Sequence, residues 1–223
     1  MTRAVIRAVV FDLDGLLVDS EPVQIASWEA FLARYDQQLS PDLLQRMFGL
    51  RVWDSARLLI DEMALPLTVD EVVAERDAIF FERLPGHLHP MPGAAATVRA
   101  LAERSLRLAL ATSGHRRYVD IVLRELGLEG MFEAEVTGEM VRNGKPAPDT
   151  YLAAAGTLGV APSSCVALED APIGIASAKA AGMICLAIPN EMTRHLTGLD
   201  RAEAILGGLD DVLPWLARAA NTP

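Results

Sequence analysis

Short apolar runs alternate with longer amphipathic stretches along most of the chain. Buried parallel strands are short apolar runs, and the connection between two parallel strands is usually a helix. The alternation therefore predicts an α/β fold with a doubly wound, mostly parallel sheet covered by helices. We expect strands at 4–11, 106–112, 131–138, 165–169, 183–189 and, as a weaker edge, 202–206, and helices at 93–104, 115–126, 148–159, 172–181 and 210–219.

Residues 20–86 break this alternation, because consecutive helical patterns follow one another there with no apolar strand between them. Thr68 and Glu71 have the spacing of a capping box, which marks the start of a helix. The segment ends in LPGHLHPMPG, whose prolines and glycines are typical of a linker. We therefore predict two parts, an α/β core of residues 1–18 and 88–223 and a helical cap of residues 19–87 inserted after the first strand.

The charge pattern narrows the class of partner. The chain carries a net charge of −10 and has no cluster of Lys and Arg, whereas binding to nucleic acid or to an anionic membrane surface needs a basic face. No stretch reaches the roughly 20 apolar residues of a membrane span. Cys165 and Cys185 lie in apolar runs, which is typical of buried free thiols. We expect a cytoplasmic, monomeric protein whose partner is neither nucleic acid nor membrane.

Polar side chains follow three of the predicted strands at the point where each strand ends. Ligands of a doubly wound sheet bind outside the carboxyl ends of its strands, so these side chains are expected to meet. Lys145, one of only two lysines in the chain, lies in NGKPAPD at the same edge. Each residue alone is compatible with a turn or a helix cap, but their joint occurrence indicates a site. The strand-end residues are Asp12, Asp14, Thr112, Ser113, Glu169 and Asp170.

These groups suit phosphoryl transfer through an aspartyl-phosphate. A carboxylate such as Asp12 is a competent nucleophile toward phosphorus, but two anions repel, so the site needs a hard cation and fixed donors. Mg²⁺ prefers oxygen ligands, which Asp12 and Asp170 with a backbone carbonyl can supply. Asp14 is near enough to protonate the leaving oxygen and later to deprotonate water. Lys145 and the Thr112 hydroxyl would hold phosphate oxygens.

Four segments resemble, in order, the four motifs of the haloacid dehalogenase-like hydrolase superfamily. They are FDLDGLLVDSE, LALATSGH, NGKPAPD and ALEDAPIGIASAKAAGM, spread over essentially the whole chain. The helical insert resembles the cap of the subfamily that contains β-phosphoglucomutase, phosphoglycolate phosphatase and sugar phosphatases. The resemblance implies Asp12 as nucleophile, Asp14 as general acid and base, Thr112 and Lys145 on the phosphate, and Mg²⁺ on Asp12, the Asp14 carbonyl and Asp170, supported by Glu169.

Several related activities have to be separated. Within the superfamily, dehalogenases carry another residue where this chain has Asp14, and phosphonate hydrolases use a cap lysine, which residues 1–144 do not contain. β-Phosphoglucomutase has a histidine where this chain has Gln24, and this difference favours a phosphatase acting on a small phosphorylated metabolite, such as a sugar phosphate. The alternatives are a phosphosugar mutase and a phospho-accepting signalling domain without turnover.

The cap is expected to select the substrate. Arg51 resembles a cap arginine that reaches toward the substrate, and Arg76 lies near a cap position that is often basic in related enzymes. His115 follows the second motif and could face the mouth of the site. Each of these three residues is equally compatible with an exposed helix surface. We place Arg51 and Gln24, with Ser113 of the core, among the residues that bind the substrate or its phosphate.

Movement of the cap would need hinges where the chain enters and leaves it. We expect these hinges at 19–22, which includes Glu21, and at 84–92. Trp28 and Trp53 fall at helical spacing and are predicted to lie in the core of the cap.

Overall fold

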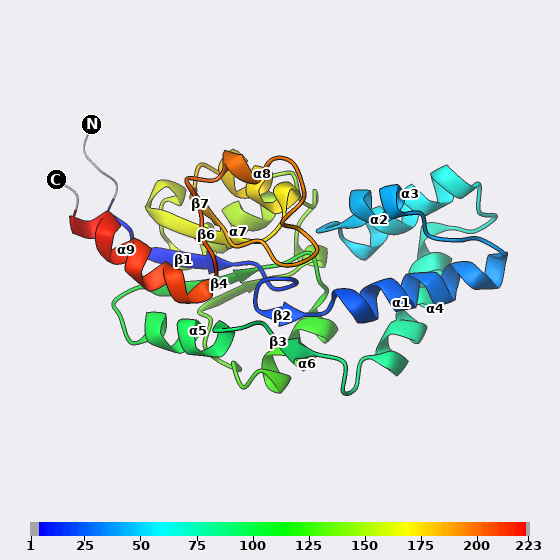
Figure 1. The fold of residues 1–223 in the computed structure, drawn as a ribbon, viewed down its shortest axis with the longest axis horizontal. Coiled ribbons are helices and arrows are strands. Elements are labelled where there is room, and N and C mark those ends of the chain that lie inside the picture. The colour runs from blue at the N-terminus through cyan, green and yellow to red at the C-terminus, as the bar shows by residue number, and fades with distance from the viewer. Residues whose placement is uncertain (1–4, 222–223) are drawn as a thin grey trace.

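The computed structural model describes residues 5–221 and contains a parallel sheet with a helical lobe at one end (Figure 1). The strands are β1 (Ala8–Phe11), β4 (Arg107–Ala111), β5 (Ala134–Val136), β6 (Cys165–Glu169), β7 (Ile184–Ala187) and β8 (Ala204–Ile205). Their order in the sheet is β5-β4-β1-β6-β7-β8, and every neighbouring pair is parallel. The predicted α/β fold is confirmed, and β1 lies in the interior of the sheet, between β4 and β6.

Helices cover both faces of this sheet. Alternate residues of β1 point to opposite faces and pack against different helices. Val9 and Phe11 belong to one hydrophobic cluster, with side chains of α5 (Ala94–Ala102), α6 (Arg116–Glu125) and α9 (Val212–Asn221). Ala8 and Val10 belong to the other cluster, with side chains of α7 (Asp149–Leu158) and α8 (Pro172–Ala180). The sheet is thus the middle of three layers, as Figure 1 shows.

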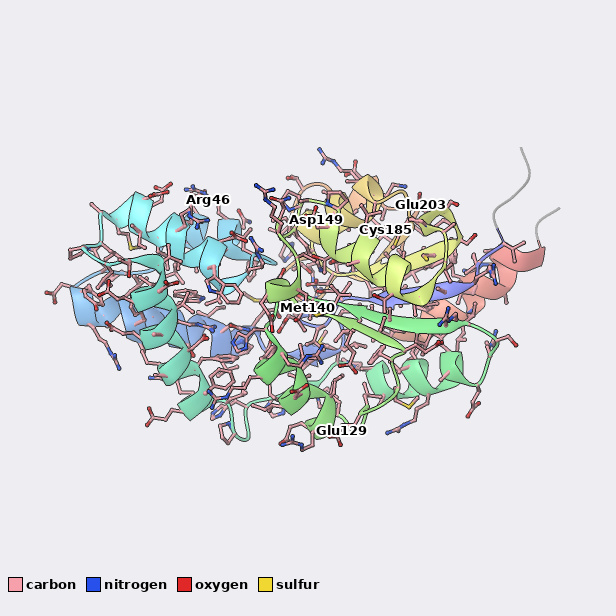
Figure 2. All side chains as sticks on the ribbon, turned by 180° about the vertical axis from the view of Figure 1, so that it is seen from behind. Arg46, Glu129, Met140, Asp149, Cys185 and Glu203 are labelled. Carbon is pink, nitrogen blue, oxygen red and sulfur yellow. The ribbon has the colours of Figure 1, made fainter. Side chains whose placement is uncertain are left out.

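The inserted lobe has a hydrophobic cluster of its own. Its helices are α1 (Glu21–Leu32), α2 (Pro41–Met47), α3 (Val52–Met63) and α4 (Val69–Arg83). Trp28, Phe31 and Leu59 lie in this cluster, so the prediction for Trp28 is confirmed. The prediction for Trp53 is wrong, because its indole lies beside His115 of the core, with ring centroids 6.4 Å apart. We call residues 20–86 the cap and the sheet with its helices the core; Arg46 on the cap and Glu203 on the core are labelled in Figure 2.

A two-stranded antiparallel sheet joins the chain segments that enter and leave the cap. β2 (Val18–Asp19) pairs with β3 (His89–Pro90), and the Met91 N–H donates to the Leu17 carbonyl at 3.0 Å. These strands were not expected, because a strand of two residues has no readable alternation. The β2–β3 pair lies within or beside the segments predicted as hinges. Backbone hydrogen bonds therefore join the two linkers where they leave the core.

The observed elements are shorter than several of the predicted ones. The strand predicted at 4–11 begins at Ala8, and Ala4 lies outside the described residues, as do the rest of 1–4 and 222–223. Cys165 and Cys185 are buried free thiols, as predicted. Among the helices of residues 5–221, none combines the length and the apolar character that crossing a bilayer requires.

Candidate active site

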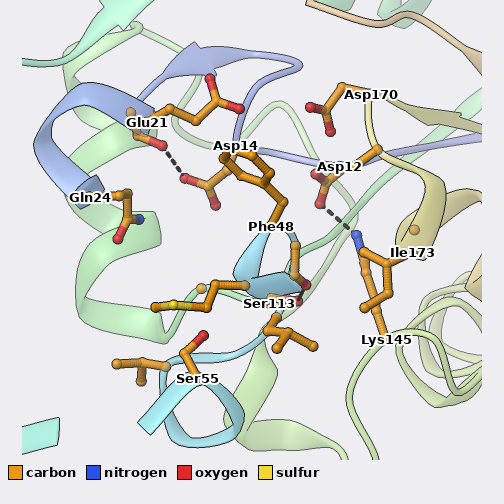
Figure 3. A pocket seen from close by; sticks show the side chains of 18 of the residues that line it. Asp12, Asp14, Glu21, Gln24, Phe48, Ser55, Ser113, Lys145, Asp170 and Ile173 are labelled. Atoms are coloured by element: carbon orange, nitrogen blue, oxygen red, sulfur yellow. Dashed lines mark hydrogen bonds and ion pairs between the residues drawn. The ribbon is translucent and has the colours of Figure 1, made fainter. Parts of the chain in front are cut away.

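The carboxyl ends of β1, β4 and β6 meet at the edge of the sheet that faces the cap. The predicted residues Asp12, Asp14, Glu169 and Asp170 all line one pocket there, together with Lys145. Figure 3 shows the Asp12, Asp14 and Asp170 carboxylates and the Lys145 amine around this pocket. The strand-end rule therefore located these residues, because the register of β1 with β6 places the residues after Phe11 and after Leu168 side by side.

Lys145 links two carboxylates of the pocket. Its Nζ donates to Asp12 Oδ1 at 2.7 Å and to Glu169 Oε1 at 2.5 Å, and the Tyr151 hydroxyl donates to the same Glu169 oxygen at 2.6 Å. Burial alone would lower the pKa of Lys145, but the charges of Asp12 and Glu169 outweigh it and raise that pKa above its ordinary value. Lys145 is therefore a fixed positive charge beside Asp12.

Asp14 is held by two hydroxyl groups. The Ser20 hydroxyl and the Tyr118 hydroxyl both donate to Asp14 Oδ1, each at 2.5 Å. Burial raises the pKa of Asp14, and the negative charge of Asp12 adds to this effect. A carboxyl group with a raised pKa can carry a proton closer to neutral pH, which suits a general acid. Neither hydroxyl was predicted, and Tyr118 is a core aromatic whose sequence context gives no sign of a polar role.

Asn190 connects the remaining carboxylates. Its Nδ2 donates to Asp170 Oδ2 at 3.0 Å, to the Gly15 carbonyl at 3.1 Å and to Glu21 Oε1 at 3.2 Å. Glu21, expected as part of a hinge, lines the pocket, where burial raises its pKa to about 7. Asn190 was missed, although it follows the strand predicted at 183–189 and the strand-end rule could have found it.

Gly15 has a local reason to be glycine. Its φ is +74°, and a Cβ at this position would lie 2.4 Å from Asp170 Oδ2. Only a residue without a side chain allows this turn to pass so close to Asp170. The backbone after β1 is therefore placed directly against the carboxylate that follows β6.

Three buried carboxylates could hold a divalent cation. Asp12, Glu169 and Asp170 each offer an oxygen within 4.8 Å of the others. Burial, with the charges of Glu169 and Asp12, raises the pKa of Asp170 well above its ordinary value, which shows that its anionic form lacks compensation. A hard cation would supply this compensation. Glu169 Oε1 accepts from two donors, Lys145 and Tyr151, whereas Asp12 and Asp170 each accept from one side-chain donor, so Asp12 and Asp170 fit best as direct ligands.

Two predicted phosphate ligands differ in their placement. Thr112 is fully buried and does not line the pocket; its Oγ1 accepts a hydrogen bond from the Gly114 N–H at 2.9 Å and so supports the loop after β4. Ser113 lines the pocket, and its hydroxyl donates to the Gly49 carbonyl of the cap at 2.7 Å. The loop after β4 therefore contacts the cap directly.

Arg51 does not line the pocket, contrary to the expectation from sequence. Its Nε donates to Asp54 Oδ2 at 2.6 Å, and its Nη1 reaches the carbonyls of Gly138, Val141 and Arg142 at 3.2–3.4 Å. Three carbonyl acceptors hold the guanidinium on the core, and the carboxylate of Asp54 contacts it from the cap. Arg51 is thus a contact between cap and core.

Gln24 and Arg76 line the pocket from the cap side. Arg76 is only 3% exposed, so it is not a solvated surface residue. Its Nη2 donates to Gln24 Oε1, and its guanidinium lies over the ring of Phe80, 4.3 Å from the centroid. Polar groups of the cap thus face the carboxylates of the core across one pocket.

Comparisons with known proteins agree with this geometry. A family model described as haloacid dehalogenase-like hydrolase matches residues 6–182. The chain is 34% identical to (DL)-glycerol-3-phosphatase 1, mitochondrial, of Arabidopsis thaliana over 220 residues, which cover 95% of this chain and 73% of the relative. It is 31% identical to the fructose-1-phosphate phosphatase YqaB of Escherichia coli over 175 residues, covering 78% and 92%. The β-phosphoglucomutase structure from Clostridium difficile superposes with a TM-score of 0.85 at 18% identity, covering 97% of this chain and 98% of that one, and so shares the fold.

Proposed function

The chain belongs to the haloacid dehalogenase-like hydrolases and is an enzyme of the phosphatase type, and we propose that it hydrolyses a small phosphorylated sugar or polyol with the help of Mg²⁺. The observation that carries this proposal is the pairing of Asp12 with Lys145 at the end of β1, with Asp14 two residues further along the same loop. A nucleophile, a fixed cation and an acid are thereby gathered in one pocket.

Asp12 is the nucleophile in the first step. One of its carboxylate oxygens attacks phosphorus, the bond from phosphorus to the ester oxygen breaks, and Asp14 gives its proton to the leaving alkoxide. Lys145 neutralises negative charge beside the reacting phosphoryl group. The product of this step is a phosphorylated Asp12 and a free alcohol.

Water completes the reaction in the second step. Asp14, now ionised, takes a proton from the water that attacks phosphorus, and the bond from phosphorus to Asp12 breaks. The Ser20 and Tyr118 hydroxyls hold the Asp14 carboxyl group in place, so that it serves as acid first and as base afterwards. Inorganic phosphate is released and Asp12 is regenerated.

Asp12, Asp170 and the Asp14 carbonyl would hold Mg²⁺, with Glu169 behind them, in keeping with the uncompensated carboxylates of the pocket. The bound cation would supply positive charge that lets an anionic nucleophile approach an anionic phosphate. The cap covers the pocket and would limit the access of bulk water.

The mutase alternative differs in what accepts the phosphoryl group, since a second sugar hydroxyl would take the place of water. The named relatives that are phosphatases favour hydrolysis. A panel of fructose 1-phosphate, glycerol 3-phosphate, phosphoglycolate and β-glucose 1-phosphate, the last also with a glucose bisphosphate as primer, tests both activities in the presence of Mg²⁺. Release of inorganic phosphate that is lost in Asp12→Asn supports the proposal. Conversion of β-glucose 1-phosphate to glucose 6-phosphate without phosphate release would instead identify a mutase, and no reaction with any compound would refute both.

A further inference from the structure

His115 belongs to the core, but its side chain contacts the cap. It follows the loop after β4 and precedes α6. Its Nε2 lies 3.2 Å from Asp77 Oδ2, and its ring packs against Phe81 and Trp53, with centroid separations of 5.4 and 6.4 Å. All three partners belong to cap helices α3 and α4. His115 is therefore a point at which the core contacts the cap.

Asp77 contacts both His115 and Arg76, its neighbour in the sequence. One carboxylate oxygen faces His115, and the other accepts a hydrogen bond from Arg76 Nη1 at 3.0 Å. Burial would raise the pKa of Asp77, but His115 and Arg76 outweigh this effect and lower it. Asp77 is thus an anion that bridges a residue of the core and a residue of the pocket.

Arg76 is the cationic side chain that the cap contributes to the lining of the pocket. Its guanidinium lies near the rings of Trp28 and Phe80, 5.0 and 4.3 Å from their centroids, and its Nη2 donates to Gln24. Its buried Nε has no hydrogen-bond partner among the described residues. A buried donor without a partner is costly and indicates that an acceptor is supplied by something else. A hydroxyl or carbonyl oxygen of a substrate would be such an acceptor.

We propose that His115 is a positioning residue, which holds Arg76 through Asp77 in the orientation that recognises the end of the substrate remote from the phosphate. This inference rests on the proposed function, since it concerns the substrate of the same pocket. Recognition then depends on closure, because the His115–Asp77 contact joins core to cap and can exist only when the two meet. The His115–Asp77–Arg76 contacts do not affect the binding of a substrate too short to reach Arg76.

Kinetics of His115→Ala with two substrates test the proposal. The first is the phosphate ester of the panel that the enzyme hydrolyses fastest, and the second is acetyl phosphate, which has no remote end. We expect kcat/KM for the ester to fall at least about tenfold, as for loss of a charge-assisted hydrogen bond, while kcat/KM for acetyl phosphate stays within about twofold. His115→Gln, which can donate to Asp77 from nearly the same place, should restore most of the loss. His195→Ala, which replaces an exposed histidine that does not line the pocket, is the matched control.

A double-mutant cycle with Asp77→Asn gives a second measurement. Because both residues act through Arg76, we expect the double variant to lose little more than either single variant. Equal losses on both substrates, no loss on the ester, or additive effects in the cycle would overturn the inference. Circular dichroism and thermal unfolding verify that each variant is folded. If the wild-type enzyme releases phosphate from neither substrate, the proposed function itself fails, which is a different result from an active enzyme that is indifferent to His115.

Discussion

Asp12 and Lys145 lie 133 residues apart in the chain, and the lysine Nζ donates a 2.7 Å hydrogen bond to the aspartate Oδ1. The same Nζ holds Glu169, so one cation fixes the ends of two neighbouring strands. This pairing compensates part of the charge that five carboxylates bring to the pocket. It leaves Asp170, whose polar partner is the neutral Asn190, as the group with most to gain from a metal ion.

Replacement of the general acid Asp14 should slow the reaction by an amount that depends on the leaving group. Asp14→Asn keeps the shape of the side chain but has no proton to give, so kcat for a sugar or polyol phosphate should fall by about 10²- to 10⁴-fold. Release of p-nitrophenol from p-nitrophenyl phosphate in the first turnover should fall far less, because this leaving group is stable without protonation. Rapid-mixing kinetics with both substrates measure the contrast; equal losses would contradict the role of Asp14.

Mg²⁺ should stabilise the folded protein through Asp170. A ligand that binds the native state raises its melting temperature in proportion to the logarithm of the ligand concentration above Kd. We expect Mg²⁺ to raise Tm of the wild type, measured after treatment with chelator, and to have little effect on Asp170→Asn. Asp149→Asn changes the first residue of α7, whose carboxylate accepts a hydrogen bond from the exposed Asn143, and provides the control. A shift of equal size in Asp170→Asn would place the metal elsewhere.

Glu21 should make the metal-free protein less stable as the pH rises. The pKa of Glu21 is about 7 in the folded protein, whereas its ordinary value is 4.5. The contribution of its neutral form to the stability of the folded protein is therefore complete below pH 4.5 and is lost as the pH rises through 7. Glu21→Gln cannot ionise, and its stability relative to the wild type should therefore increase between pH 5 and pH 8, by on the order of 3 kcal/mol at most. Denaturant unfolding in chelator measures this difference. A constant difference across this range would show that Glu21 does not titrate as inferred.

Arg51 should affect all substrates alike, unlike Arg76 and its partners. Arg51→Ala removes the contacts of the cap with the carbonyls at 138–142, which weakens closure whatever the substrate is. We expect kcat/KM to fall by a similar factor, about 5- to 30-fold, for acetyl phosphate and for the fastest ester of the panel. Arg57→Ala, whose side chain is 62% exposed, should leave both values unchanged. A loss of kcat/KM for the ester alone would indicate that Arg51 recognises the substrate.

The core of this fold is readable in the sequence because its strands are buried on both faces. Buried parallel strands such as Cys165–Glu169 are apolar up to their carboxyl end, where Glu169 and Asp170 follow, so both the strand and the site residues at its end can be located. The same reasoning gives Asp12 and Asp170, and it would have given Asn190 after β7 had it been applied there.

The parts that could not be predicted depend on contacts between distant segments. Tyr118 and Tyr151 have the spacing of core aromatics, and only the packing of α6 and α7 shows that their hydroxyls reach Asp14 and Glu169. The contacts of Arg51 and His115 depend on how the cap meets the core, which no periodicity along the chain encodes. The local sequence thus specifies the core and its carboxylates, whereas the cap–core contacts follow from tertiary structure.

The proposed mechanism requires the phosphoryl group to pass through Asp12. Asp14→Asn with p-nitrophenyl phosphate should trap it there, because the leaving group needs no acid while the second step still needs a base. We predict a burst of about one equivalent of p-nitrophenol per enzyme and, after an acid quench, a phosphorylated peptide that mass spectrometry maps to Asp12. The Asp12→Asn, Asp14→Asn double variant should show neither. A phosphoryl group on another residue, or steady turnover without any phosphorylated protein, would show that Asp12 is not the nucleophile.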